Sequence, residues 1–152
     1  MIIKSLDQLN SFSQKIADHL EEKDYIFLSG EIGVGKTTFT RYLINYLQKK
    51  DGLKATEVLS PTFNLLYEYD LKKCKIMHYD LYRIKKAEEL VHLGIFSENE
   101  KTIKIVEWPG LIKTPLTNKL EVHLEYGKND NERKMNIHGP VSYTHLRAHE
   151  TV

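Results

Sequence analysis

The residues best suited to chemistry in this chain lie in one short stretch, residues 30–37, which reads GEIGVGKT. Its spacing satisfies G-x-x-x-x-G-K-[ST], the phosphate-binding P-loop, at every fixed position. Glycines let successive backbone N–H groups converge on phosphate oxygens without a side-chain clash. The Lys36 ammonium can then reach the β- and γ-phosphates of a nucleotide, and the Thr37 hydroxyl can bind Mg²⁺. The predicted phosphate-binding residues are Glu31, Ile32, Gly33, Val34, Gly35, Lys36, Thr37 and Thr38.

Two carboxylates, Asp80 and Glu107, each end an apolar run that predicts a strand. In open α/β sheets, ligands bind beyond the carboxyl ends of the parallel strands. We therefore expect one of the two acids to hold Mg²⁺ opposite Thr37, directly or through water. The alternative for each acid is an ordinary strand-end charge that faces solvent. The loop hydroxyl of Thr62, which follows Pro61, is a further candidate for sensing the γ-phosphate and its metal.

The elements needed to position these groups can be predicted from the chain in order. An apolar run at 25–28 predicts a buried strand, and helical spacing of apolar residues continues to residue 50. An amphipathic helix is expected over 5–22, with Ser5 or Asp7 as its cap. We also expect a short strand or extended piece around 58–59, a hairpin of 65–69 with 75–80, and a short helix at 87–93. Further strands are expected at 103–107, 120–126 and 133–138. The expected fold class is α/β, a three-layer P-loop NTPase-like fold with a mixed, mostly parallel central sheet that is antiparallel at the hairpin and the C-terminal strands.

Composition narrows the class of protein. The chain has 152 residues, 41% hydrophobic and 28% charged, with a net charge of +1. This balance gives no electrostatic case for strong direct binding to nucleic acid. The single cysteine, together with the lack of a membrane-length apolar run or signal-peptide pattern, favours the cytoplasm. We expect one P-loop ATPase domain over 1–139 and a non-native or disordered tail over 140–152, whose His145 and His149 lack the further ligands of a metal site.

A GTPase-like switch is an alternative that two short motifs raise. Residues 107–110 (EWPG) echo the D-x-x-G loop, and residues 118–121 (NKLE) echo the N-K-x-D guanine motif. The second motif should follow a strand, but Asn118 stands just before one. Guanine specificity is therefore poorly supported.

Five motifs in order resemble the TsaE (YjeE-type) family, bacterial P-loop ATPases of tRNA threonylcarbamoyladenosine synthesis. They are GEIGVGKTT at 30–38, SPTF at 60–63, HYDLYR at 78–83, Glu89-Leu90 with Leu93-Gly94, and EWP at 107–109. The resemblance runs from about residue 5 to Gly139. It implies an ATP-hydrolysing accessory subunit that works with TsaD and TsaB subunits to install threonylcarbamoyl on adenosine 37 of ANN-decoding tRNAs, with tRNA contacted indirectly through the complex.

The resemblance also implies roles for individual residues. Thr37 and Glu107 would hold Mg²⁺, Asp80 would support hydrolysis beside Lys36, and Trp108 would border the nucleotide or a partner. The family often has Thr where this chain has Asn10, near the adenine, and a basic residue near Arg133. Asn can still donate and accept hydrogen bonds, so Asn10 and Arg133 are included among the expected nucleotide contacts.

Two other activities compete with ATP hydrolysis. In one, the chain is a nucleotide-gated binding subunit in which ATP stabilises an assembly and turnover is incidental. In the other, it is a small-molecule kinase. The sequence contains no arginine-rich lid to close over an acceptor phosphate, which counts against the kinase. We therefore expect ATP or ADP with Mg²⁺ as the ligands of a weak ATPase that partners stimulate.

Overall fold

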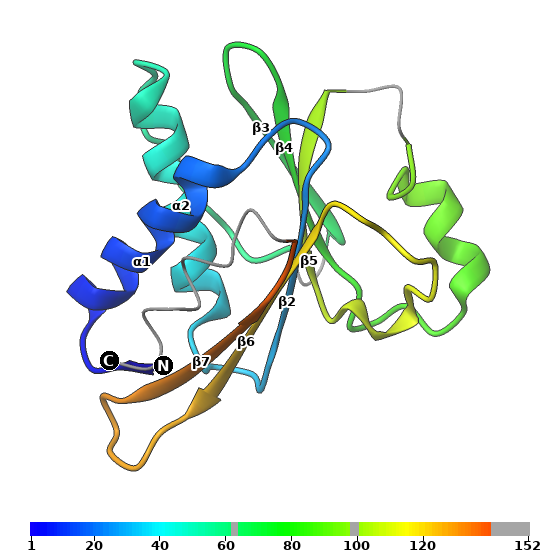
Figure 1. The fold of residues 1–152 in the computed structure, drawn as a ribbon. Coiled ribbons are helices and arrows are strands. Elements are labelled where there is room, and N and C mark those ends of the chain that lie inside the picture. The colour runs from blue at the N-terminus through cyan, green and yellow to red at the C-terminus, as the bar shows by residue number, and fades with distance from the viewer. Residues whose placement is uncertain (62–63, 98–100, 141–152) are drawn as a thin grey trace.

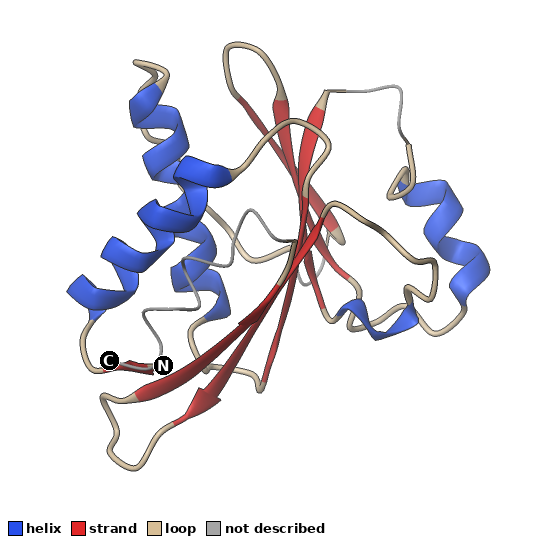
Figure 2. Ribbon diagram, in the orientation of Figure 1, coloured by secondary structure: helices blue, strands red, loops and turns tan. Residues whose placement is uncertain are grey.

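Helices pack against both faces of one twisted sheet in the computed structural model, which describes residues 1–61, 64–97 and 101–140 (Figure 1). Two α-helices cover one face, and a short 3₁₀ helix with connecting loops covers the other (Figure 2). The strands are β1 (Ile2–Ile3), β2 (Tyr25–Gly30), β3 (Leu66–Asp70), β4 (Lys75–Asp80), β5 (Thr102–Glu107), β6 (Lys119–Tyr126) and β7 (Arg133–His138). The helices are α1 (Leu6–His19), α2 (Lys36–Lys50) and two 3₁₀ helices, Ala87–Leu93 and Pro109–Leu111.

The sheet is mixed, as predicted, with the order β1-β7-β6-β2-β5-β4-β3. Its centre is parallel, because β2 pairs with both β6 and β5, and β5 pairs with β4, in the parallel sense. The flanks are antiparallel: β3 with β4 on one side, and β6, β7 and β1 on the other. The parallel pairings are therefore confined to the centre, where β2, β4, β5 and β6 bring their carboxyl ends to one edge. That edge carries the P-loop.

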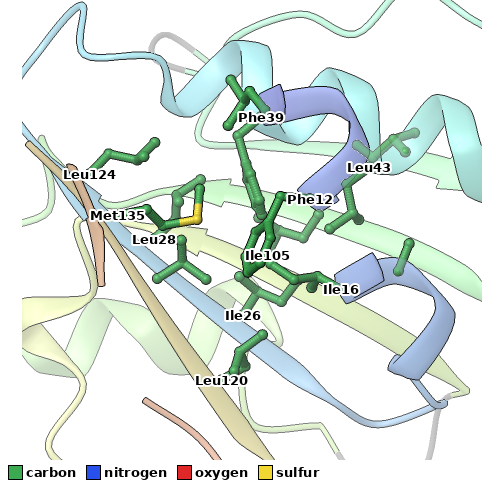
Figure 3. Close-up of a cluster of buried hydrophobic side chains, with 14 of the residues drawn as sticks. Phe12, Ile16, Ile26, Leu28, Phe39, Leu43, Ile105, Leu120, Leu124 and Met135 are labelled. Atoms are coloured by element: carbon green, nitrogen blue, oxygen red, sulfur yellow. The ribbon is translucent and has the colours of Figure 1, made fainter. Parts of the chain in front are cut away.

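The main core lies between the sheet and the two α-helices (Figure 3). Ser5 is the N-cap of α1, and its hydroxyl accepts a hydrogen bond from the Gln8 N–H at 3.2 Å, so the Ser5 cap is confirmed. Its apolar residues recur at helical spacing and are buried against the sheet. Together with residues of β2, β5 and α2 they form one buried cluster. Its members include Phe12, Ile16, Ile26, Leu28, Phe39, Leu43 and Ile105.

The opposite face of the sheet has a smaller core under the 3₁₀ helix Ala87–Leu93. Tyr79 is fully buried there, and its hydroxyl donates to the Leu93 carbonyl at 2.8 Å. Gly94 then takes a left-handed conformation (φ 70°) that ends the helix. The predicted three layers are present, with this third layer thinner than the first.

Some elements differ from the sequence-based expectation. Residues 58–59 form no strand, because the segment 53–60 has no regular structure. The Gln48 side chain hydrogen-bonds to Thr56, and the Leu59 N–H donates to the Tyr69 hydroxyl. The strand β1 was not predicted, and α1 ends at His19, three residues short of the expected boundary. Thr62 and residues 141–152 lie outside the described residues, so the predictions for them remain predictions. Within the described ranges, no helix has the length and apolar character to cross a membrane.

Candidate nucleotide-binding site

The P-loop connects the carboxyl end of β2 to the first turn of α2, in the strand–turn–helix order that the motif requires. Gly30 approaches β6 so closely that a Cβ atom would lie 2.4 Å from the Leu124 carbonyl oxygen. Gly35 is the N-cap of α2 with φ 122°, and no side chain caps the helix. The first-turn N–H groups of a helix lack carbonyl partners within it. This end of α2 can therefore accept an anion, which the helix dipole also favours.

The β6–β7 hairpin holds the P-loop from outside. The Tyr126 hydroxyl donates to the Ile32 carbonyl at 3.1 Å, and Arg133 Nε donates to the Val34 carbonyl at 2.8 Å. The Arg133 guanidinium also lies 4.7 Å from the centre of the Tyr126 ring. With these carbonyls bound to the hairpin, the loop is fixed in a conformation that leaves its amide dipoles for a phosphate. Arg133 thus contacts the backbone of the P-loop, and its expected contact with the nucleotide stays a prediction.

The Lys36 side chain is buried at the centre of the site. Its ammonium donates to the Gly30 carbonyl at 2.6 Å and lies 3.8 Å from the centre of the Trp108 ring. Burial lowers the pKa of Lys36, and the charges of Glu107 and Asp80 act in the opposite direction, to raise it. Trp108 has a left-handed backbone (φ 56°), which is uncommon for a bulky residue. Its indole also packs on Tyr82, with ring centres 4.9 Å apart.

Asp80 and Glu107 are cross-strand neighbours at the ends of β4 and β5, and Glu107 also aligns with Leu28 of β2. Their exposed fractions are 5% and 3%, so the alternative of solvent-facing strand-end charges is wrong. Asp80 Oδ1 accepts from the Tyr82 N–H at 2.9 Å. Glu107 Oε2 lies 2.8 Å from Nε2 of His78, a fully buried residue.

These residues fit a magnesium ion beside a nucleotide. Mg²⁺ prefers hard oxygen ligands, often one or two carboxylates completed by phosphate oxygens and water. Two buried carboxylates lie near Lys36, and Thr37 occupies the first turn of α2. No cluster of three or more His, Cys, Asp or Glu residues suited to a metal occurs among the residues that the structure describes. The donor set therefore suits a metal whose coordination is completed by a ligand rather than by protein alone.

A cavity opens beside the P-loop between α1 and β7. Its walls bring together the loop glycines, Thr38 and Arg133 with charged and polar residues from two other segments, Lys4, Asp7, Asp130 and Asn131. Asn10 lies elsewhere, in a groove between α1 and α2, where its side-chain oxygen accepts from Gln14 at 3.4 Å. Asn10 is not among the residues that line this cavity, and its expected contact with the nucleotide stays a prediction.

The GTPase-like motif falls at the wrong edge of the sheet. Asn118 immediately precedes β6, and its carbonyl accepts from the Tyr25 N–H at the first residue of β2. Because β2 and β6 are parallel, Asn118 lies at the opposite end of the strands from the P-loop. A guanine base at the loop could not reach it, so the sequence-based argument against this motif is confirmed.

Two residues of the site were not identified from the sequence. His78 lies inside the HYDLYR motif, and the sequence analysis assigns it no role. Tyr126 ends an alternating strand, and only the fold brings its hydroxyl to the P-loop. The spacing of His78 and Asp80 could have indicated that His78 lies at the site, since residues two apart on a strand share a face.

Comparisons with known proteins bear on the family and on the fold. A family model described as "Threonylcarbamoyl adenosine biosynthesis protein TsaE" matches residues 3–135. A tRNA threonylcarbamoyladenosine biosynthesis protein TsaE from Rickettsia prowazekii is 38% identical over 137 residues, covering 90% of this chain and 92% of the relative. The protein of the same name from Aquifex aeolicus is 33% identical over 138 residues, covering 91% and 94%. A crystal structure of YdiB from Bacillus subtilis is 21% identical with a TM-score of 0.68 and covers 99% of this chain and 90% of that one, which shows a shared fold.

Proposed function

This chain belongs to the TsaE family of threonylcarbamoyl adenosine biosynthesis proteins, and we propose that it acts there as a Mg²⁺-dependent ATPase. In this proposal it is an accessory subunit of the complex that installs threonylcarbamoyl on adenosine 37 of ANN-decoding tRNAs. TsaD-like and TsaB-like subunits are its partners, tRNA is contacted through them, and the complex works in the cytoplasm.

The observation that carries the proposal is the pairing of Asp80 and Glu107 beside Lys36. Two carboxylates buried next to each other at a strand edge are costly unless a cation or hydrogen bonds compensate them. Lys36 supplies one positive charge, and a divalent cation that arrives with a nucleotide would supply the rest. A site built only to hold a neutral or anionic ligand would gain nothing from these two acids.

Each residue then has a role that its position supports. The P-loop amides and Lys36 bind the phosphates, while Thr37 and Glu107 would hold Mg²⁺, which neutralises charge that develops on the transferred phosphoryl group. Asp80, tied by one oxygen to the Tyr82 N–H, orients the attacking water or the water around the metal. The cavity beside Arg133 and Thr38 receives the nucleoside.

A nucleotide-gated assembly subunit remains the second candidate, because one chain of contacts links the phosphate site to the surface. Lys36 contacts Trp108, and Trp108 packs on Tyr82, which is 57% exposed. Phosphate binding that draws Lys36 away would free the indole and alter the surface that a partner meets. In this case ATP binding, rather than turnover, would control assembly.

Reconstitution distinguishes these functions. Purified chain is combined with TsaD and TsaB, a transcript of an ANN-decoding tRNA, the threonylcarbamoyl donor, and γ-labelled ATP. The proposed ATPase gives free labelled phosphate and modified adenosine, and both should be lost with Asp80→Asn. Modified adenosine at full yield with Asp80→Asn, which should still bind ATP, would favour the gated subunit. Label on an added small-molecule acceptor would favour the kinase.

A further inference from the structure

The imidazole of His78 is the unusual polar group of this core. It lies in the middle of β4 between Tyr67 of β3 and Ile105 of β5, and no part of it is exposed. Its Nε2 is 2.8 Å from Glu107 Oε2, with both side chains almost completely enclosed. This short contact between buried groups is a stronger restraint than a surface ion pair, because solvent cannot compete for it.

The contact with a carboxylate oxygen indicates which ring nitrogen is the donor. An ionised carboxylate only accepts hydrogen bonds, so Nε2 is the donor. The other ring nitrogen, Nδ1, is buried and meets no hydrogen-bonding group in the described part of the chain. Most buried polar atoms are paired, so the unpaired Nδ1 makes an imidazole less favourable here than an apolar side chain of similar size. The bond to Glu107 is therefore what the imidazole contributes.

That bond determines how the carboxylate is presented. Oε2 is occupied by His78, while Oε1 accepts no hydrogen bond from the described residues. His78 and Asp80 lie two residues apart on β4 and so share a face, and Glu107 is the cross-strand neighbour of Asp80. One strand thus carries both the acid beside Glu107 and the group that restrains Glu107.

We infer that His78 is a positioning residue: it holds Glu107 by one oxygen so that the other is presented to the metal that accompanies the nucleotide. The inference rests on the proposed function, in which Glu107 is a metal ligand. Partners of metal ligands commonly fix ligand orientation, and their loss typically costs about 10–100-fold in metal affinity. His78 does not touch the nucleotide in this scheme and acts only through Glu107.

The test measures how strongly Mg²⁺ enhances nucleotide binding. Affinity for a non-hydrolysable ATP analogue is determined by calorimetry in Mg²⁺ and in EDTA, and the ratio of the two affinities is the readout. For His78→Phe we expect a fall in this ratio of about 10-fold or more, with affinity in EDTA within about twofold of wild type. His78→Gln, whose amide can donate to Glu107, should retain more of the ratio. His123→Gln is the matched control, because His123 also contacts a carboxylate, Glu125 at 3.2 Å, but at the surface.

The two inferences fail in different ways. If Glu107→Ala leaves the ratio at its wild-type value, Glu107 is not the metal ligand and the proposed site is wrong. If Glu107→Ala reduces the ratio to about one but folded His78→Phe keeps it at the wild-type value, the positioning role is wrong and His78 only fills the core. Nitrogen NMR of the wild-type imidazole needs no variant to fold: we expect Nε2 protonated and Nδ1 bare, and the opposite tautomer would also overturn the inference.

Discussion

Lys36 contacts Trp108 in the nucleotide site: its ammonium lies 3.8 Å from the centre of the indole ring and 2.6 Å from the Gly30 carbonyl oxygen. When phosphate oxygens bind the Lys36 ammonium, they compete with both of these contacts. A cation over an aromatic face is worth roughly 0.5–2 kcal/mol, less than a charge-assisted bond to a polyphosphate. The contact therefore holds the lysine inside the site without blocking nucleotide binding.

The first prediction follows from this contact. We expect Lys36→Ala to lower affinity for ATP at least about 100-fold, because two charge-assisted hydrogen bonds of about 1.5–3 kcal/mol each are lost. Trp108 is the sole tryptophan of the chain, so its emission should change when ATP draws Lys36 from the ring. Calorimetry and fluorescence titration measure the two effects. Lys49→Ala, an exposed lysine on the same helix, is the control, and equal affinity in wild type and Lys36→Ala would refute the site.

The second prediction separates the two buried acids. Glu107→Ala should make nucleotide affinity nearly indifferent to Mg²⁺, because it removes a metal ligand. Asp80→Asn should keep Mg²⁺-dependent binding and lose turnover, because the amide retains the shape but not the charge that orients water. Binding is measured by calorimetry and turnover by phosphate release. The reverse pattern would show that Asp80 is the metal ligand.

The local parts of this fold could be predicted from the sequence, and the P-loop is the best example. The strand, glycine turn and helix from Tyr25 to Lys50 depend on neighbours along the chain, as do the β3–β4 hairpin and the left-handed stop at Gly94. The mixed sheet follows from the same patterns. Of the two forms expected around 58–59, the strand is absent, because hydrogen bonds from Gln48 and to the Tyr69 hydroxyl, rather than a sheet, hold that segment.

The functional contacts that were missed connect residues far apart in sequence. Tyr126 and Ile32 are 94 positions apart, and His78 and Glu107 are 29 apart. The residue pattern within one segment does not indicate which distant residue it will contact, because the order of the strands in the sheet determines those contacts. Asn10, expected near the nucleotide base, lines a groove between α1 and α2, and its contact with the nucleotide stays a prediction.

The third prediction concerns the hairpin that holds the loop. Tyr126→Phe removes the hydroxyl that donates to the Ile32 carbonyl and leaves the ring in place. Since one hydrogen bond contributes about 1 kcal/mol net, we expect ATP affinity to fall by about fivefold with little change in melting temperature. Tyr46→Phe is the matched control, because it removes a hydroxyl that donates to Asp18 on the helical face. An equal loss of affinity in both variants would count against a specific role for the hairpin.

The last prediction concerns turnover. A P-loop enzyme without an arginine finger compensates charge on the γ-phosphoryl group poorly, and a finger is typically worth about 10³–10⁵ in rate. Arg83, which follows Tyr82 three residues after Asp80, is an exposed residue. We therefore expect slow ATP hydrolysis by the isolated chain, raised at least about tenfold by a TsaD–TsaB pair.

Arg83 tests whether that stimulation depends on the exposed segment after β4. Arg83→Ala should lower the stimulated rate more than the basal rate, because an exposed arginine next to the exposed Tyr82 is available to a partner. Both rates are measured as phosphate release at saturating ATP in matched buffer, with Arg41→Ala on the outer face of α2 as the control. If the isolated chain already hydrolyses ATP at its full rate and partners leave that rate unchanged, the chain is a free-standing enzyme. A parallel fall in both rates would instead place Arg83 in basal catalysis, so the ratio of stimulated to basal rate is the quantity that decides between partner contact and chemistry.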